Sequence, residues 1–504
     1  MTRTSLALRP RDPALRGLLS AVRSSLAGDV YVVGGFLRDL LARRPAPDLD
    51  LAVSIDAGDA AAAIARACGG HDFALDEDRC QFRVVLPPEA VLRCIDVSPL
   101  KGELGADLAA RDFTIDAMAA ALQPDGSLGP LIDPFSGRSD VEKGTVRLTS
   151  EGVLTDDPLR LLRGARIATE LDFSLAPETA EAIARRRGLL NRAAAERRRD
   201  ELCRILTAPR AARGLRLLDS LGLLEELVPE ITAARGVVQP KEHSWDVFDH
   251  SLETVAVLDS LLGQGAARDA WCGRLRRPFR QALDPHGLDE YFAASAGGQS
   301  RLALTKLAGL LHDVGKPETR RPDDTGRIRF FGHAELGGRT ATAVCSRLRL
   351  GGRETRFVSL LVEEHLRPTQ LSQGGVPTNR AIFRFFRDLD EAALACLVLS
   401  LADAAAAVGP RLEARRWRGH VAYVEQILAR REALAVQPAA RRLISGREIM
   451  ATLGIGPGPE VGRLLAAVDE AAGCGEISTP TEALSLARAL HEAGRGEPTG
   501  VGAA

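Results

Sequence analysis

The sequence predicts an α+β protein, in which a small N-terminal domain with a mixed β-sheet precedes a long all-helical remainder. Segments rich in β-branched residues occur between about residues 25 and 150. From about residue 151 onward, apolar residues recur at i, i+3 and i+4, which is the spacing of one helix face. Alanine, leucine and arginine are abundant and favour helix, whereas only 4% of the residues are aromatic. Because 504 residues exceed one ordinary domain, we expect several domains.

The expected elements follow the chain in order. Short strands are predicted at residues 29–33, 49–53, 81–86 and 92–97, with a helix at 56–68. Further helices are predicted at 157–171 and 176–190, within a second helical block at 240–405, and in a last segment at 406–504. Residues 263–300 interrupt the second block and are rich in glycine, arginine and proline, which predicts an insertion or loop.

Charge and cysteine content limit the classes of protein to consider. The formal net charge is −1, so contacts with a nucleic acid must come from local arginine clusters rather than from an overall basic field. The eight cysteines are scattered without a C-x-x-C pair, which predicts reduced thiols and a cytoplasmic location. We identify no run of about twenty apolar residues and therefore expect no membrane span.

A glycine pair follows the first predicted strand and opens a helix. Gly34 and Gly35 let the backbone approach a phosphate closely, and the helix N-terminus supplies free N–H donors. Arg38 lies one helical turn further and can add a charge-assisted contact, with Asp39 beside it. Taken alone, the pattern is more typical of an ordinary strand-to-helix turn.

Two aspartates alternate on the second predicted strand. Residues i and i+2 of a strand point to the same face, so Asp48 and Asp50 project side by side. Such carboxylates repel each other, and a pair of magnesium ions would supply partners suited to in-line phosphoryl transfer. Asp96 on a later strand is a candidate third carboxylate. The alternative is that these aspartates simply face solvent.

A series of charged residues begins the helical part. Asp157, Arg160 and Arg163 have i, i+3, i+6 spacing and are predicted to share one helix face, and Arg166 follows. An acceptor and a fork of donors can pair with the Watson–Crick edge of cytosine or adenine. The alternative is an exposed helix face carrying ion pairs.

These segments together resemble the class II tRNA nucleotidyltransferase and bacterial poly(A) polymerase superfamily. The turn G-G-F-L-R-D at 34–39 and D-L-D at 48–50 match its head domain, and R-D-F-T-I-D-A at 111–117 is similar to its R-R-D-F-T-x-N-A segment. I-D-P-F-S-G at 132–137 resembles the turn that closes the head. The segments at 156–166 and 195–202 resemble two motifs of its neck. The resemblance covers roughly residues 25–235, with the motifs in the family's order.

The resemblance implies transfer of CMP and/or AMP from CTP and ATP to a tRNA 3′ end, without a template. Asp48, Asp50 and Asp96 would be the catalytic residues, with Mg²⁺ held by the first two. The implied nucleotide-binding residues are Gly34, Gly35, Arg38, Asp39, Arg111, Asp112, Asp157, Arg160, Arg163 and Arg166. Poly(A) polymerase is the alternative within the superfamily, although the near-neutral tail lacks the basic arm that would favour it.

Two positions and the length of one loop depart from the family pattern. Ala110 stands where the family often has arginine, and Asp116 stands where it usually has asparagine. Only residues 97–110 separate Asp96 from Arg111, whereas enzymes that build the whole CCA end have a longer flexible loop here. A short loop is the mark of enzymes that add CC alone, so CCA addition and CC addition both remain open.

Histidines and aspartates in the second helical block form another ordered set. His250, His312, Asp313, His333, His365 and Asp403 are spread along this block, and the four histidines are expected at helix ends or turns near acidic residues. Imidazole and carboxylate together suit a divalent transition metal or Mg²⁺. The H…HD…D order resembles the HD phosphohydrolase superfamily, which implies a metal site and a phosphodiesterase or phosphatase activity. A second candidate function is therefore a metal-dependent hydrolase with a degenerate transferase head.

The domain organisation follows from both resemblances. We expect a nucleotidyltransferase head at 25–150, a helical neck at 151–235, an HD-type domain at 236–405 and a helical tail at 406–504. The tail either contacts tRNA or serves as a helical cap. The expected partners are a tRNA 3′ end, CTP and ATP, with neither DNA nor a membrane.

Overall fold

The computed structural model describes residues 12–240, 244–263, 270–372, 375–435 and 443–495. The chain divides into two compact units, Met1–Leu227 and Val228–Ala504. The first unit contains a mixed sheet followed by helices, and the described part of the second is helical apart from one small hairpin. This arrangement confirms the predicted fold class.

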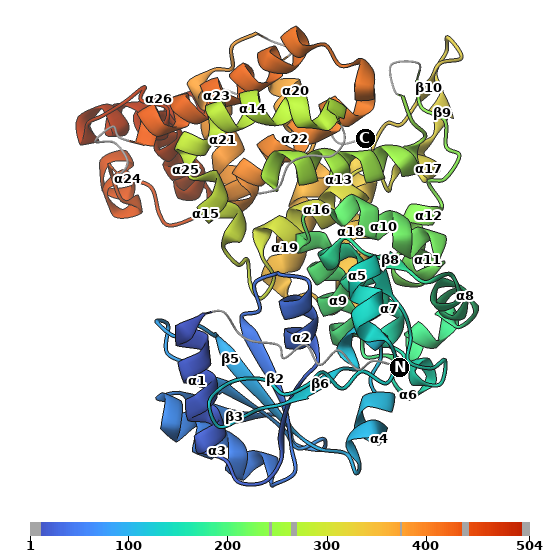
Figure 1. Ribbon diagram of the computed structural model, residues 1–504. Helices are drawn as coiled ribbons and strands as arrows, with labels where there is room; N and C mark the ends of the chain where they lie inside the picture. Colours follow the sequence, from blue (N-terminus) through green and yellow to red (C-terminus); the bar gives the residue numbers. More distant parts are fainter. Residues whose placement is uncertain (1–11, 241–243, 264–269, 373–374, 436–442, 496–504) are drawn as a thin grey trace. The chain divides into compact units, whose positions relative to one another are not determined.

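A six-stranded sheet occupies the beginning of the first unit, drawn in blue to cyan in Figure 1. Its strands, in the order β3-β4-β5-β2-β1-β6, are β1 (Val30–Val33), β2 (Asp48–Val53), β3 (His71–Asp76), β4 (Gln81–Val85), β5 (Cys94–Pro99) and β6 (Ala119–Ala121). β2 and β5 run parallel, and the remaining neighbours are antiparallel. Leu49 and Leu51 of β2 are fully buried, so Asp48 and Asp50 share the opposite face of the strand.

Two strands of this sheet are not predicted by the sequence. β3 is exposed at five of its six positions, so it lacks the alternation that marks a half-buried strand. β6 consists of three alanines, which favour helix. Both lie at the edges of the sheet, where pairing with a neighbour rather than local preference decides the conformation.

Helices make up most of the rest of the first unit. They are α1 (Pro13–Ser24), α2 (Gly35–Leu41), α3 (Ala57–Cys68), α4 (Leu104–Ala109), α5 (Gly137–Lys143), α6 (Val153–Asp156), α7 (Arg160–Leu171), α8 (Pro177–Arg185), α9 (Ala195–Thr207), α10 (Ala211–Ser220) and α11 (Leu223–Leu227). A short parallel pair joins β7 (Thr145–Val146) to β8 (Ser174–Leu175).

The start of α7 corrects a prediction. Asp157 is extended, with φ −140° and ψ 100°, and the helix begins only at Arg160. Pro158 follows Asp157, and a proline disfavours the helical conformation in the residue before it. The predicted helix face shared by Asp157, Arg160 and Arg163 is therefore wrong.

The second unit is built from helices. They are α12 (Pro229–Thr232), α13 (Val247–Leu262), α14 (Ala270–Leu283), α15 (Leu288–Ala293), α16 (Arg301–Leu311), α17 (Lys316–Thr319), α18 (His333–Arg347), α19 (Gly352–Glu364), α20 (Arg367–Ser372), α21 (Asn379–Leu389), α22 (Ala393–Val408), α23 (Ala414–Ala435), α24 (Gly446–Leu453), α25 (Pro459–Gly473) and α26 (Pro480–Arg495). The hairpin pairs β9 (Arg321–Pro322) with β10 (Ile328–Arg329), beside α17 in Figure 1.

The loop predicted at 263–300 is wrong for most of its length. α14 and α15 lie within it, and α14 packs against α13 and α23. Leu275, Phe279 and Leu283 of α14 are buried at helical spacing, while its arginines lie between them. The many arginines and Pro278 conceal this apolar face in the sequence, which is why composition alone predicts a loop.

One apolar stretch of the second unit is buried. By length and composition alone, Asn379–Arg411 could cross a membrane, with a mean hydropathy of 2.0 in its most apolar window. However, 72% of that window is buried inside the protein, and α22 packs against α13. This burial is typical of a core helix.

The last three helices share a small core of their own. Ile449 of α24, Leu464 and Val468 of α25 and Ala483 of α26 are fully buried against one another. This core packs the three helices against one another. The two expected roles of the tail, contact with tRNA and a helical cap, both stay predictions.

Candidate functional site

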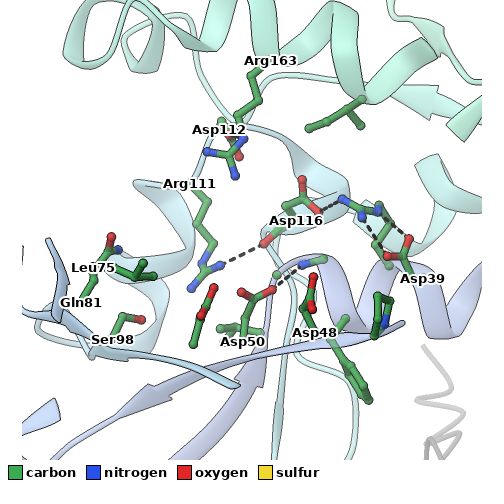
Figure 2. Close-up of a pocket in the computed structure, with 18 of the residues that line it drawn as sticks. Asp39, Asp48, Asp50, Leu75, Gln81, Ser98, Arg111, Asp112, Asp116 and Arg163 are labelled. Atoms are coloured by element: carbon green, nitrogen blue, oxygen red, sulfur yellow. Dashed lines mark hydrogen bonds and ion pairs between the residues drawn. The ribbon is translucent and has the colours of Figure 1, made fainter. Parts of the chain in front are cut away.

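A cavity of about 370 Å³ opens above the sheet of the first unit (Figure 2). The glycine pair, β2, β5 and the start of the helical part all contribute to its wall. Of the residues singled out in the sequence, those that line it are Gly34, Gly35, Arg38, Asp39, Asp48, Asp50, Asp96, Arg111, Asp112, Asp116, Arg163 and Arg166. Asp157 and Arg160 are not among its lining residues.

The glycine turn packs directly against one aspartate. Gly34 has φ +69°, and a Cβ built on it would lie 2.9 Å from the Oδ2 atom of Asp50. The backbone N–H of Gly35 donates a hydrogen bond to the same oxygen at 3.2 Å. The first glycine is therefore required both by the left-handed backbone and by the lack of room for a side chain.

Three carboxylates come together along two neighbouring strands. The parallel register places Asp50 opposite Asp96, and Asp48 lies two residues before Asp50. Burial, and after it the charge of Asp96, raise the pKa of Asp50 to about 6. A cation would relieve this repulsion, and carboxylate oxygens are the ligands that Mg²⁺ prefers, so the residues fit a divalent metal.

Protein groups hold two of these carboxylates. Arg83 donates two hydrogen bonds to Asp96, each of 2.7 Å. Asp48 accepts from Arg93 at 3.0 Å and from the Cys94 thiol at 3.2 Å. The sequence did not single out Arg83, because its contact with Asp96 depends on the pairing of β4 with β5.

A buried ion-pair network surrounds the glycine turn. Arg38 donates to Asp116 at 2.7 Å and to both oxygens of Asp39 at 3.0 Å. Asp116, the departure from the family's asparagine, is buried, and this burial raises its pKa. Arg163 lies 3.1 Å from Asp112. Arg38 is therefore engaged by protein carboxylates, and its contact with a phosphate stays a prediction.

The other predicted base-reading residues have different surroundings. Arg197 of α9 donates to both oxygens of Asp157, at 2.8 and 3.3 Å. Arg160 donates to backbone carbonyls, at 3.0 Å to Ala110 and 3.3 Å to Val153. Contacts with these protein groups satisfy both side chains, so their predicted pairing with a base stays a prediction.

Arg166 forms ion pairs with glutamates of the protein. It is buried and pairs with Glu170 at 2.8 Å and with Glu201 at 2.7 Å. The pair with Glu170 lies within α7, and the pair with Glu201 joins α7 to α9. Arg204 of α9 also lines the cavity and lies 3.3 Å from Glu170. The sequence did not reveal Arg204, because its approach depends on how the two helices pack.

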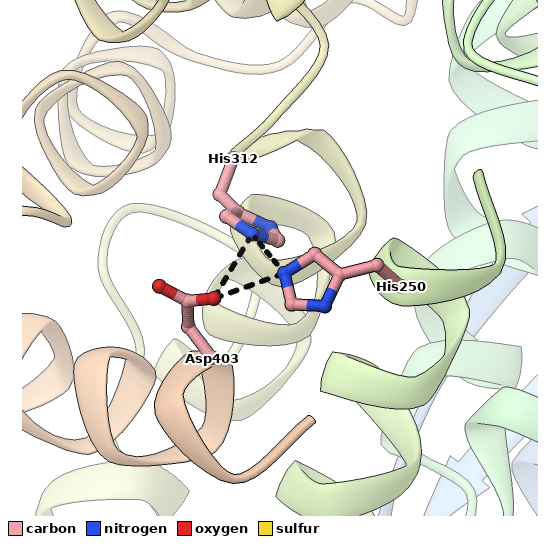
Figure 3. A group of neighbouring side chains, drawn as sticks. All are labelled: His250, His312 and Asp403. Atoms are coloured by element: carbon pink, nitrogen blue, oxygen red, sulfur yellow. Dashed lines mark hydrogen bonds and ion pairs between the residues drawn. The ribbon is translucent and has the colours of Figure 1, made fainter. Parts of the chain in front are cut away.

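The second unit brings the predicted histidines and aspartates together, and Figure 3 shows three of them, His250, His312 and Asp403. His250, His312 and Asp403 form one group whose ligand atoms all lie within 4.8 Å of one another. The Nε2 atoms of His250 and His312 are 3.2 Å apart, and Asp403 Oδ1 lies 2.9 Å from His250 Nε2. The arrangement brings His250 of α13 and Asp403 of α22 together with His312, which directly follows α16.

A second group consists of His312, which belongs to both groups, with Asp313 and His365. The ligand atoms of these three residues also lie within 4.8 Å of one another. His333 completes the set, with its Nε2 atom 3.4 Å from Asp313 Oδ1. His250, His312, Asp313 and His365 are almost fully buried. All six predicted residues therefore lie in one cluster, and Asp313 stands near each of the four imidazoles.

The orientation of the imidazoles suits a metal. His312, His333 and His365 each place Nδ1 within 2.7–2.8 Å of the carbonyl of the residue three positions earlier. A proton on Nδ1 leaves the Nε2 lone pair facing the cluster. Burial lowers the pKa of His365 to about 4 and also lowers that of His333, which keeps both rings neutral.

The cluster also contains a buried group that needs a partner. His333 Nε2 has no hydrogen-bond partner among the described residues, although it is buried. Lys316 donates to Asp313 and to Gln239, both at 2.6 Å. The mixed nitrogen and oxygen donors, the convergent rings and the unsatisfied nitrogen all fit a divalent cation.

Comparison with known proteins agrees with this organisation. The Poly A polymerase head domain matches residues 30–147, the probable RNA and SrmB-binding site of polymerase A matches 172–235, and the HD domain matches 247–408. An A-adding tRNA nucleotidyltransferase of Deinococcus radiodurans is 36% identical over 92% of this chain and 95% of its own. The chain belongs to the tRNA nucleotidyltransferase family.

Other members of the tRNA nucleotidyltransferase family match over a similar length. A CC-adding tRNA nucleotidyltransferase of Thermus thermophilus is 35% identical over 90% of this chain and 92% of its own. The solved structure of a CCA-adding enzyme with ATP has a TM-score of 0.61 at 20% identity, covering 95% of this chain and 94% of that one. The structural likeness shows a shared fold, and the resemblance found in the sequence is confirmed.

Proposed function

We propose that this tRNA nucleotidyltransferase transfers CMP or AMP from CTP or ATP to the 3′ hydroxyl of tRNA, with release of pyrophosphate. One observation carries the proposal: Asp48 and Asp50 share one face of β2 and line the same cavity as the glycine turn and Arg111. The names of the full-length relatives support the choice of tRNA as the acceptor. Scattered cysteines without disulfides support a cytoplasmic location.

Asp48 and Asp50 would hold Mg²⁺ in this reaction. When bound, a pair of such ions stabilises the attacking and leaving oxygens of an in-line phosphoryl transfer. Arg111 and Asp112 orient the nucleotide's sugar and phosphates, while the glycine turn keeps Asp50 in place through the Gly35 N–H. Asp96, paired with Arg83, adds negative charge next to Asp50 and so favours cation binding.

We further infer that the enzyme adds only part of the CCA end, either CC or A. β5 ends at Pro99 and α4 begins at Leu104, so a four-residue connection and a short helix stand where complete CCA builders resemble one another in having a long flexible loop. Without such a loop, the pocket has less means of changing shape between CTP and ATP. The names of the two relatives that match over about nine-tenths of the chain support partial addition.

Extension of defined tRNAs tests both statements. The purified protein is incubated with Mg²⁺ and CTP, ATP or both, with one tRNA that lacks CCA and another that ends in CC. Partial addition is supported by either of two results. The tRNA that lacks CCA is extended by CC and no further, or only the tRNA that ends in CC is extended, by a single A. Growth by complete CCA contradicts the partial inference, and no growth on either tRNA contradicts the transferase proposal.

The HD cluster supports a second candidate function. We propose that the six residues of the cluster, Asp313 included, bind a divalent transition metal or Mg²⁺ and that the site hydrolyses phosphoesters of nucleotides or RNA ends. When bound, the cation polarises a phosphate and activates water. Hydrolysis of simple phosphodiesters and phosphomonoesters by the protein reloaded with Mn²⁺, Ni²⁺ or Mg²⁺ tests the activity. The proposal fails if none of these metals supports turnover.

A further inference from the structure

Arg83 stands behind one of the cavity's carboxylates rather than in the cavity wall. It lies on β4 directly opposite Asp96 of β5, and Asp96 in turn lies opposite Asp50 of β2. Residues that pair in this way share one face of the sheet, so Asp96 stands between Arg83 and Asp50. Asp96 lines the cavity, whereas Arg83 does not.

The contact between Arg83 and Asp96 is a two-pronged one. The Nε and Nη2 groups of Arg83 donate hydrogen bonds of 2.7 Å each, to Asp96 Oδ1 and Oδ2 respectively. A bidentate pair of this kind fixes the plane of a carboxylate as well as its position. Each oxygen of Asp96 keeps a second lone pair, so the carboxylate can still accept a contact from the cavity side.

The other two carboxylates of the cavity are held differently. Asp48 accepts single bonds from two separate groups, one of them Arg93, whose side chain is 74% exposed. Asp50 accepts one bond from a backbone N–H at 3.2 Å. The Arg83 side chain is only 36% exposed, and one planar group holds both oxygens of its partner. Asp96 is thus the carboxylate whose orientation the protein fixes through a single guanidinium.

We propose that Arg83 is a positioning residue of the transferase, which fixes the orientation of the Asp96 carboxylate beside Asp50 for the transfer step. This inference rests on the proposed transferase function. Without Arg83, a carboxylate next to another negative charge rotates to reduce the repulsion. A group misplaced by about 1 Å can lower a reaction rate about 100-fold. The loss should appear in kcat, because Arg83 itself does not line the cavity in which the nucleotide binds.

Steady-state kinetics of matched variants tests this role. Values of kcat, and of KM for the nucleotide and for tRNA, are measured for the wild type, Arg83→Ala, Arg83→Lys and Arg79→Ala. The acceptor is whichever tRNA the wild type extends, the one that lacks CCA or the one that ends in CC. Arg79→Ala is the control, because Arg79 lies in the turn between β3 and β4, is 52% exposed and does not line the cavity. Thermal unfolding shows whether each variant is folded.

We expect Arg83→Ala to lower kcat between about 10-fold and 100-fold, as is usual when a group that orients a reactive side chain is lost, and to change either KM less than about threefold. Arg83→Lys should recover only part of kcat, because an ammonium group acts as a point charge and cannot hold both oxygens in one plane. Arg79→Ala should match the wild type.

A double variant tests whether Arg83 acts through Asp96. Extension is followed over hours in single turnover with excess enzyme, so that slow rates are measured. In an Asp96→Ala background, Arg83→Ala should lower the rate less than about threefold further, because its partner is already absent.

Four results would overturn the proposal. Unchanged kinetics of Arg83→Ala would show that Arg83 has no role, and a higher KM with unchanged kcat would show that it contacts the nucleotide or tRNA itself. Full activity of Arg83→Lys would show that only the positive charge matters. A further loss of about tenfold in the Asp96→Ala background would show that Arg83 acts independently of Asp96. The transferase function fails separately, if the wild type extends neither tRNA.

Discussion

Arg38 donates a 2.7 Å hydrogen bond to Asp116, the residue that stands where the family usually has asparagine. The same guanidinium binds both oxygens of Asp39, so one cation serves two carboxylates beside the glycine turn. All three side chains are less than one-fifth exposed. The substitution at position 116 therefore adds a buried charge to the wall of the nucleotidyltransferase cavity, and Arg38 compensates for it.

Replacing Arg38 should lower the free energy of unfolding much more than replacing its partner Asp116. Arg38→Ala leaves two largely buried carboxylates without their cation, and we expect a loss of about 3–5 kcal/mol in the free energy of unfolding. Asp116→Asn keeps an acceptor for Arg38 and removes a charge whose burial raises the pKa of Asp116, so we expect a change below about 1 kcal/mol. Denaturant unfolding measures both, and equal losses would contradict the compensation by Arg38.

Asp50→Asn should abolish most nucleotide addition while preserving the fold. Asn keeps an acceptor oxygen for the Gly35 N–H but lacks the charge that a divalent cation needs, so we expect a loss of at least about 100-fold in the rate of CMP or AMP transfer. Asp125→Asn is the matched control, because Asp125 is exposed and lies outside the cavity. Transfer by Asp50→Asn within a few-fold of the wild type would rule out Asp50 as a metal ligand.

Arg197→Ala should loosen nucleotide selection. Arg197 fixes the Asp157 carboxylate through two hydrogen bonds, and a carboxylate that rotates freely discriminates less well between base edges. We expect discrimination between CTP or ATP and UTP to fall about tenfold in single-turnover extension of tRNA. Arg185→Ala serves as the control, since Arg185 pairs with the exposed Glu151. Unchanged discrimination would mean that Asp157 does not read the base.

His312→Ala should empty the HD cluster of metal. His312 belongs to both groups of neighbouring ligand atoms, so its loss removes a donor from each. Metal content per chain, measured by mass spectrometry after loading with Mn²⁺ or Ni²⁺ and desalting, should fall to background. His286→Ala should retain the wild-type content, because His286 contacts Glu432 instead. If His312→Ala retained the metal, the ion would have to bind at a site other than the HD cluster.

The sequence predicts the features of this protein that depend on local spacing. The alternation of Asp48 and Asp50 with Leu49 and Leu51 fixes which face of β2 carries the carboxylates. The order of the histidines likewise predicts a cluster that the fold assembles from separate helices. In both cases residue type and chain order carry the information.

The sequence does not predict features that depend on contacts between residues far apart in the chain. It also misses positions where one residue, such as a proline, overrides the pattern around it. Arg83 reaches Asp96 only because β4 pairs with β5, and Arg204 reaches the cavity only through the packing of α7 and α9. The charged spacing that continues through Asp157 predicts a helix there, although Pro158 keeps this residue extended.

The carbonyl contacts behind His312, His333 and His365 also bear on how the protein acquires its metal. Rings already held from behind need no rearrangement when an ion arrives, so the apoprotein and the loaded protein should share one conformation. Affinity for first-row ions at a mixed nitrogen and oxygen site follows a common chemical order whatever the protein. Which metal ion fills such a preformed site therefore depends largely on which ions are available in the cell. Protein purified from cells grown in different media should carry different ions at the same site.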